Sequence, residues 1–276
     1  MELQWFEGIL YGFLSGLAEF LPVSSHAHRA MLLQLLGYGG DDALLRLFAH
    51  IGALGGLFFA MRGHISQLRR QAALKRIPPR RRKRFPDPRY ISELSLLKTA
   101  AIPLLLTLVF YFKTVEWAGK LQWVALFSLL NGLILLAPGF FATGNKDARS
   151  TSLLDRLLIG FSSIFSLLPG VSRVGVTHSA ALLRGAAAEH ACSWSLLLSL
   201  PALGCMILWD IYLAATSAHT ISFLSILIGL LCCLFSFAGS CLAVTWMRSR
   251  MAKASAVSFG YYSLGAALFA FILYLI

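Results

Sequence analysis

Several apolar stretches of this chain are long enough to cross a lipid bilayer, and this feature limits the possible folds more than any other. A helix needs about 20 consecutive apolar residues to cover the hydrocarbon core. The stretches 121–141, 220–246 and 254–276 reach that length. Charged residues make up 13% of the chain, whereas soluble domains carry about 25%. The sequence therefore predicts an all-α integral membrane protein.

Hydropathy along the chain predicts about six full spans and two interrupted apolar segments. Irregular backbone inside a bilayer is tolerated where protein or a cavity surrounds it. The interrupted segments, at about 3–37 and 153–186, each contain a break rich in Pro and Ser. We interpret both as re-entrant helical hairpins. The predicted spans lie at about 44–61, 93–113, 121–141, 189–214, 220–247 and 254–276.

The charges of the loops alternate along the chain and so indicate its orientation. Eleven Lys or Arg lie between Arg62 and Tyr90, whereas the turn at 215–219 has none. Because loops rich in Lys and Arg stay in the cytoplasm, we expect 62–92, 142–156 and 247–253 to be cytoplasmic. The C-terminus would then lie outside. The protein is thus expected to be a multi-pass membrane protein.

The basic 62–92 loop has two readings. A nucleic-acid-binding arm is basic, but a loop between two spans is better placed to face anionic lipid. We therefore expect membrane lipids as partners, and no nucleic acid. Because this loop contains four prolines, we expect no long helix there.

The two interrupted segments resemble each other in sequence. Residues 21–25 read Leu-Pro-Val-Ser-Ser, and residues 168–172 read Leu-Pro-Gly-Val-Ser. Each half of the chain, 1–141 and 142–276, would then hold one hairpin and three spans. An odd number of spans inverts the second half, which predicts an inverted-topology repeat whose interrupted helices meet near the midplane. The alternative is chance similarity between apolar segments.

Polar and charged side chains cluster at both breaks. Such groups inside a membrane are costly and are functional candidates by default. If the hairpin tips meet, a carboxylate, a guanidinium, hydroxyls and imidazoles share one pocket. Arginine offers a planar fork of donors that fits phosphate oxygens, and half-helix N-termini add N–H groups. The residues are Glu19, Ser24, Ser25, His26 and His28 in the first hairpin, and Ser172, Arg173, Thr177 and His178 in the second.

These residue types suit phosphate chemistry. Ser25 could attack phosphorus if a base takes its proton, and His28 lies three residues further on, where it could face the same side of a helix. Glu19 could orient His28 or hold a divalent ion. Gly170 and Gly175 would let the backbone approach a ligand closely.

Each candidate also has a structural alternative. Arg173 could cap a helix C-terminus, and Ser24 and Ser25 could be helix N-caps after the proline. The imidazoles could be packing groups beside the site. The five cysteines lie in apolar segments and could be small buried hydrophobic residues. The histidines concerned are His26, His50 and His178.

At these residues the chain resembles the undecaprenyl-pyrophosphate phosphatase family, also called the bacitracin-resistance protein family. The first motif is 19–25, Glu-Phe-Leu-Pro-Val-Ser-Ser, followed by His28. The second is 169–173, Pro-Gly-Val-Ser-Arg, followed by Gly175 and Thr177. The resemblance covers nearly the whole chain. It implies a bacterial inner-membrane enzyme that hydrolyses a C55 isoprenoid diphosphate to the monophosphate, the carrier lipid of peptidoglycan synthesis, at a site open to the periplasm.

The resemblance also implies roles for individual residues. Ser25 would be the nucleophile, His28 its acid/base partner, Glu19 an essential carboxylate and metal ligand, and Arg173 the phosphate clamp. A divalent cation, Mg²⁺ or Ca²⁺, is the implied cofactor, and a polyprenyl diphosphate is the implied substrate. A homodimer is left open. Further phosphate-binding residues would be Ser24, Gly170, Ser172, Gly175 and Thr177.

The chain departs from the family pattern near these motifs. Ser15 stands where the family has Glu or Gln, which removes one acidic group. His26-Ala27 replaces Thr-Gly, Val174 replaces Ser, and His50 replaces a Gln of the third helix. We expect Ser15, His26, His50 and His178 to lie around the catalytic groups.

Two other functions fit part of the pattern. A transporter or flippase of a polyprenyl phosphate or a related phospholipid would share the inverted repeat, because fold alone does not determine function. A non-catalytic membrane scaffold would have little use for the polar cluster. Release of phosphate from the lipid distinguishes the enzyme from both.

Overall fold

A computed structural model describes residues 4–39, 42–78, 85–110, 117, 120–141, 144–216, 222–250 and 256–276. These residues form helices, and no strand is found among them. Among the described residues, five helical stretches are long and apolar enough to cross a membrane, which confirms the all-α membrane fold. They are α3 (Ala43–Ala60), α7 (Leu121–Leu136) continued by η2 (Ala137–Phe140), α10 (Ala188–Thr216), α11 (Phe223–Arg250) and α12 (Val257–Leu275).

These five helices coincide with five of the predicted spans to within a few residues. The sixth, 93–113, falls on α5 (Pro88–Leu108), which is not among the five and carries Arg89, Glu93 and Lys98 in its first half. Residues 111–113 of that span lie outside the described residues. So do most of the predicted turns 114–120 and 215–219 and part of 247–253.

The prediction that the basic loop would contain no long helix was wrong. Helix α4 (Arg62–Arg76) is 15 residues long and occupies the first half of the 62–92 segment. The prolines of this segment begin at Pro78, so they do not remove any hydrogen bond within α4. Helix α4 packs against α5 and buries Leu68.

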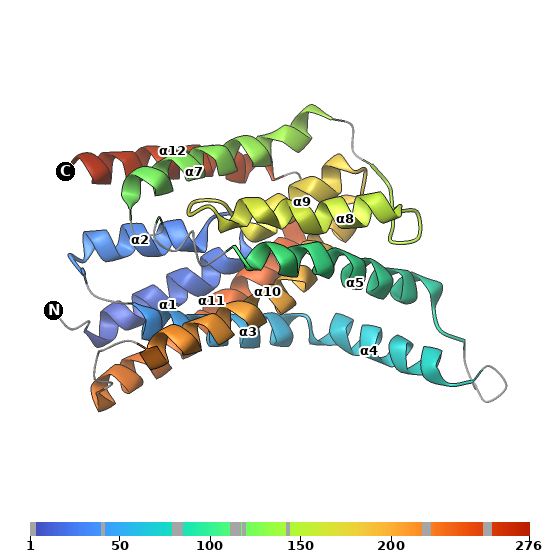
Figure 1. The fold of residues 1–276 in the computed structure, drawn as a ribbon, viewed down its shortest axis with the longest axis horizontal. Coiled ribbons are helices and arrows are strands. Elements are labelled where there is room, and N and C mark those ends of the chain that lie inside the picture. Colours follow the sequence, from blue (N-terminus) through green and yellow to red (C-terminus); the bar gives the residue numbers. More distant parts are fainter. Residues whose placement is uncertain are drawn as a thin grey trace.

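Helix α11 has extensive contacts with two other long helices. It packs between α1 (Trp5–Phe20) and α3, while α7 packs beside α12 and α5 beside α8 (Leu153–Phe161). Figure 1 shows both chain termini at one end of the molecule and the α4–α5 connection at the other. The side of the membrane on which each end lies stays a prediction from the loop charges.

Small residues allow the central helices to approach closely. A Cβ atom on Gly12 or Gly16 of α1 would overlap the carbonyl of Cys232 or Ser236 on α11. Residues Gly52 and Gly56 of α3 meet α11 in the same way. Membrane helices commonly associate through such small residues, because these let the two backbones come together.

A matched pair of glycine variants tests this packing. We expect Gly12→Ala to lower the free energy of unfolding by about 1–3 kcal/mol, because the new methyl group overlaps the α11 backbone. Gly204→Ala on α10 has nothing within 4 Å of the new atom, so it should stabilise the helix by about 0.5–1 kcal/mol. Unfolding in detergent followed by circular dichroism measures both. Equal effects of the two substitutions would refute the close contact.

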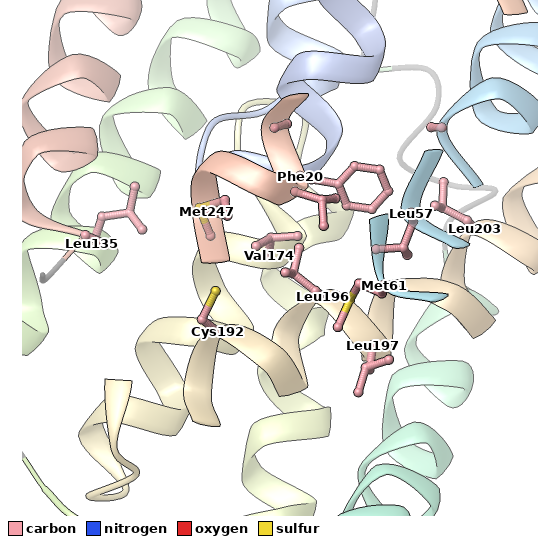
Figure 2. Packing of buried hydrophobic residues seen from close by; sticks show 14 of the residues in the cluster. Phe20, Leu57, Met61, Leu135, Val174, Cys192, Leu196, Leu197, Leu203 and Met247 are labelled. Atoms are coloured by element: carbon pink, nitrogen blue, oxygen red, sulfur yellow. The ribbon is translucent and has the colours of Figure 1, made fainter. Parts of the chain in front are cut away.

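A hydrophobic core fixes the helices on which the polar residues stand. Figure 2 shows buried side chains from α1, α3, α9 (Arg173–Leu183), α10 and α11 packed together. Phe20 and Val174 belong to this core and directly adjoin Glu19 and Arg173 in the sequence. The backbone directly after each of these charged residues is thereby held in place.

Both interrupted segments consist of helix, break and helix. Helix α1 ends at Phe20 and α2 (Ser25–Leu35) follows, while η3 (Ser162–Leu167) precedes α9. In each segment a serine caps the second helix: Ser24 Oγ accepts from the N–H of Ala27, and Ser172 Oγ accepts from the N–H of Gly175. Ser24 is thus a helix N-cap. The re-entrant insertion, the inverted orientation and the division into repeats 1–141 and 142–276 stay predictions.

Candidate active site

The two breaks meet, and Asn131 of α7 joins them. The Ser172 N–H donates to Asn131 Oδ1 at 2.9 Å. Asn131 Nδ2 in turn donates to the Pro22 carbonyl at 3.3 Å and to Ser263 Oγ of α12 at 2.9 Å. Ser172 Oγ donates directly to the Leu21 carbonyl at 3.1 Å. The side-chain amide of Asn131 therefore provides a hydrogen-bond partner for one backbone group of each break. These groups have no partner within a helix.

Glu19 and Arg173 lie side by side, as predicted. Arg173 Nη1 is 3.2 Å from Glu19 Oε1, and the two side chains are 9% and 4% exposed. Ser25 Oγ donates to Glu19 Oε2 at 2.6 Å. The second guanidinium nitrogen, Nη2, is 2.7 Å from Met206 Sδ on α10. The first hairpin thus brings a hydroxyl and a carboxylate to the guanidinium of the second.

His28 does not occupy the predicted position beside Ser25. Its Nδ1 is 2.7 Å from the Ser24 carbonyl, which only accepts, so Nδ1 carries the hydrogen. Its Nε2 is then an acceptor for the Tyr262 hydroxyl of α12 at 2.7 Å. Both ring nitrogens therefore have hydrogen-bond partners other than Ser25. A spacing of three residues in the first turn of α2 does not bring the two side chains together. Glu19 is the group that contacts the serine hydroxyl.

The two glycines of the second motif serve the backbone. Gly170 has a φ of +128°, a region that favours glycine, and a Cβ there would meet the backbone of α7. Gly175 donates its N–H to Ser172 Oγ, and Thr177 Oγ1 donates to the Arg173 carbonyl at 2.8 Å. A side chain at position 170 would have no room, since α7 fills that space; binding of phosphate at Gly170 and Gly175 stays a prediction.

A second group of charged side chains lies next to the first. Arg29 of α2 is bonded to His26 and His50, and His50 is bonded to Asp210 of α10. Arg46 of α3 also pairs with Asp210, with Nε 2.8 Å from Oδ1. Glu19 interacts electrostatically with Arg173, His50 and Arg29, so both groups belong to one polar centre.

Of the remaining predicted residues, two have contacts with this centre. Ser15 lies one turn before Glu19 on α1, and its hydroxyl has no hydrogen-bond partner among the described residues. His178 is fully buried on α9. His26 and His50 contact Arg29 and therefore do adjoin the charged groups.

The described residues show no ready-made cluster of metal ligands. Across the described part of the chain, no three His, Cys, Asp or Glu side chains are grouped in a way that could hold one. Glu19 is the carboxylate next to Ser25 and Arg173, and both of its oxygens already have protein partners. Binding of Mg²⁺ or Ca²⁺ stays a prediction from the family resemblance.

Five residues at the centre were missed by the sequence analysis: Arg29, Arg46, Asn131, Asp210 and Tyr262. For Arg29 and Asp210 the signal was available, because a charge within an apolar segment is costly and marks a functional candidate. Asn131 and Tyr262 gave a weaker signal, since amides and tyrosines occur in many spans without functional contacts.

An apolar cavity of about 440 Å³ opens beside the site. Its wall includes His28 and Tyr262, the pair that contacts through a hydrogen bond. The rest of the lining is almost entirely apolar and comes from α1, α2 and α12, including Leu14, Met31, Leu32 and Phe269. A hydrocarbon chain could therefore lie within reach of the polar centre.

Comparison with known families agrees with the two motifs. The model of the family described as bacitracin resistance protein BacA matches residues 8–269. This chain belongs to the BacA family. A relative named undecaprenyl-diphosphatase from Methanobrevibacter smithii is 32% identical over 93% of this chain and 92% of its own length. Undecaprenyl-diphosphatase 3 of Frankia alni is 33% identical over 72% of this chain and 70% of its own length.

A further BacA relative shows the same coverage at lower identity. The undecaprenyl-diphosphatase of Prochlorococcus marinus subsp. pastoris is 26% identical over 95% of this chain and 96% of its own length. The similarity thus extends through both interrupted segments and all five long apolar helices.

Proposed function

We propose that this BacA protein is an undecaprenyl-diphosphatase, which hydrolyses undecaprenyl diphosphate to undecaprenyl phosphate and inorganic phosphate. The observation that carries the proposal is the contact of Ser25, Glu19 and Arg173 across the two breaks. Membership of a family whose relatives bear this name supports the same activity. A transporter of polyprenyl phosphate is not favoured, because a paired serine and carboxylate are unnecessary for transport.

The reaction begins with binding of the terminal phosphate by Arg173, whose planar fork matches phosphate oxygens. Binding of the phosphate draws Arg173 away from Glu19. Glu19 then acts as the general base and accepts the proton of Ser25 Oγ, from which it lies 2.6 Å away. The serine oxygen forms a bond to the terminal phosphorus, and the bond from this phosphorus to the bridging oxygen breaks.

The second half of the reaction restores the serine. Glu19 gives the serine proton to the bridging oxygen, undecaprenyl phosphate leaves with that oxygen, and the phosphate remains on Ser25, so that Glu19 is again a carboxylate. Water, which gives its proton to Glu19, attacks the same phosphorus and breaks the bond to Ser25 Oγ. Inorganic phosphate is released, and the serine regains a proton. No step requires an atom that the protein, the lipid or water does not supply.

The apolar cavity beside His28 is the proposed site for the first isoprenoid units of the lipid. Its lining is largely apolar, and His28 in its wall contacts the carbonyl of Ser24, the residue before Ser25. Burial of each CH₂ group there contributes about 0.8 kcal/mol. The location in the bacterial inner membrane, with the site open to the periplasm and the 62–92 loop in the cytoplasm, is part of the same proposal and is supported by the loop charges.

The decisive test uses the purified protein in detergent with undecaprenyl diphosphate. We expect release of inorganic phosphate that rises with protein concentration, together with formation of undecaprenyl phosphate. The same preparation is reconstituted in liposomes that contain a fluorescent polyprenyl phosphate. Transbilayer movement of this lipid without any phosphate release would overturn the enzyme assignment in favour of the transporter.

A further inference from the structure

Arg29 is a buried cation that forms no ion pair with a carboxylate among the described residues. Its side chain lies on α2 next to His28, and the residue is 2% exposed. Among the residues that the structure describes, no carboxylate oxygen is within ion-pair distance of its guanidinium, whereas Arg46 pairs with Asp210 and Arg173 pairs with Glu19. An unpaired charge in a buried site is costly. Its retention points to a ligand of opposite charge.

Two imidazoles hold Arg29 without neutralising it. Nη1 is 3.1 Å from His50 Nε2, and Nη2 is 2.9 Å from His26 Nδ1. A guanidinium can only donate, so both ring nitrogens must be acceptors. The hydrogen of His50 is therefore on Nδ1, which donates to Asp210 Oδ2 at 2.5 Å. Asp210 and His50 thus orient the guanidinium while its positive charge persists.

Arg29 belongs to the same centre as the reacting groups. Glu19 interacts electrostatically with both Arg173 and Arg29, and His26 interacts with the same two arginines. Glu19 therefore lies in the field of two guanidinium groups, those of Arg29 and Arg173, beside Ser25. A guanidinium has five N–H donors, and the two imidazoles engage two of the nitrogens of Arg29.

We propose that Arg29 forms a second phosphate subsite, so that the two guanidinium groups each bind one phosphate of a diphosphate. The inference rests on the proposed function for the identity of the ligand, and on the contacts of Arg29 for its place. The positive charge comes from Arg29 and Arg173.

Binding of inorganic diphosphate tests the subsite. Isothermal titration calorimetry on the detergent-purified full chain is carried out in EDTA, so that no divalent ion bridges ligand and protein. We expect the wild type to bind and Arg29→Gln to bind about 10- to 100-fold more weakly, because charge-assisted hydrogen bonds are lost. Arg29→Lys should lose less, since it keeps the charge but not the fork. The control Arg149→Gln changes a half-exposed arginine paired with Asp147 and should bind as the wild type does.

Orthophosphate separates a phosphate subsite from a structural role. Arg29→Gln should weaken binding of diphosphate much more than binding of orthophosphate, for which Arg173 suffices. An equal loss for both ions, equal affinity of wild type and variant, or no binding by the wild type in EDTA would each overturn the proposal. If Arg29→Gln does not fold, the same two affinities are measured for Arg29→Lys. This variant should again bind diphosphate more weakly and orthophosphate with nearly unchanged affinity.

Phosphate release from undecaprenyl diphosphate, measured on the same preparations, distinguishes the two proposals. If the wild type releases phosphate but substitution of Arg29 does not change the affinity for diphosphate, the proposed enzyme function stands and the proposed second subsite is refuted. If substitution of Arg29 weakens diphosphate binding but the wild type releases no phosphate, the second subsite stands and the proposed enzyme function is refuted.

Discussion

Ser25→Ala should lower the rate of phosphate release from undecaprenyl diphosphate by about 10²- to 10⁴-fold. The substitution removes the hydroxyl that donates to Glu19 Oε2 at 2.6 Å, and a positioned pair of nucleophile and base contributes an acceleration of about this size. The affinity for inorganic diphosphate should change little, because Arg173 stays in place. Release is measured under saturating lipid, so that the effect appears in kcat.

Ser195→Ala is the matched control for this loss. Ser195 is equally a buried serine, but its hydroxyl donates to the Cys192 carbonyl within α10. We expect a kcat within about twofold of the wild type, because surrounding helix geometry is retained. A Ser25→Ala protein that is folded and as active as the control would exclude Ser25 as the nucleophile.

Asp210→Leu should lower the free energy of unfolding by about 3–5 kcal/mol, the cost of breaking a buried ion pair from one side. Asp210 is fully buried and accepts from Arg46 Nε at 2.8 Å and from His50 Nδ1 at 2.5 Å. Leucine leaves both donors without this partner. Unfolding of the purified protein in mixed detergent micelles measures the change.

The comparison for Asp210 is a salt bridge at the surface. Arg149→Met breaks the pair with Asp147, in which the two side chains are 50% and 32% exposed. Exposed pairs of this kind contribute about 0–1 kcal/mol. A loss for Asp210→Leu no larger than this would show that α3 and α10 do not depend on the buried network.

The fold and the core of the site were largely predictable from the sequence. Runs of apolar residues set the helices, and the prolines at 22 and 169 set the breaks, because proline ends a helix locally. Glu19 and Arg173 were placed together by the likeness of the two breaks. This prediction needed only the two motifs and the assumption that the breaks meet.

Contacts between helices were not predictable in the same way. Helical spacing suggested that His28 faces Ser25, but Tyr262, 234 residues further along the chain, accounts for one ring nitrogen. Asn131 joins both breaks from α7, and no pattern within α7 indicates this. Such choices depend on how helices rotate against one another, which the spacing within a single helix does not determine.

A double-mutant cycle on phosphate release tests most directly whether both breaks build one site. Glu19→Asp and Arg173→Lys are chosen because they leave the charges in place but alter the 3.2 Å contact and so preserve measurable rates. Residues that act as a unit are strongly non-additive. We predict that the double variant is little slower than the slower single variant. If the fold reductions in rate of the two single variants multiply in the double variant, the two residues act independently, and this would contradict a shared site.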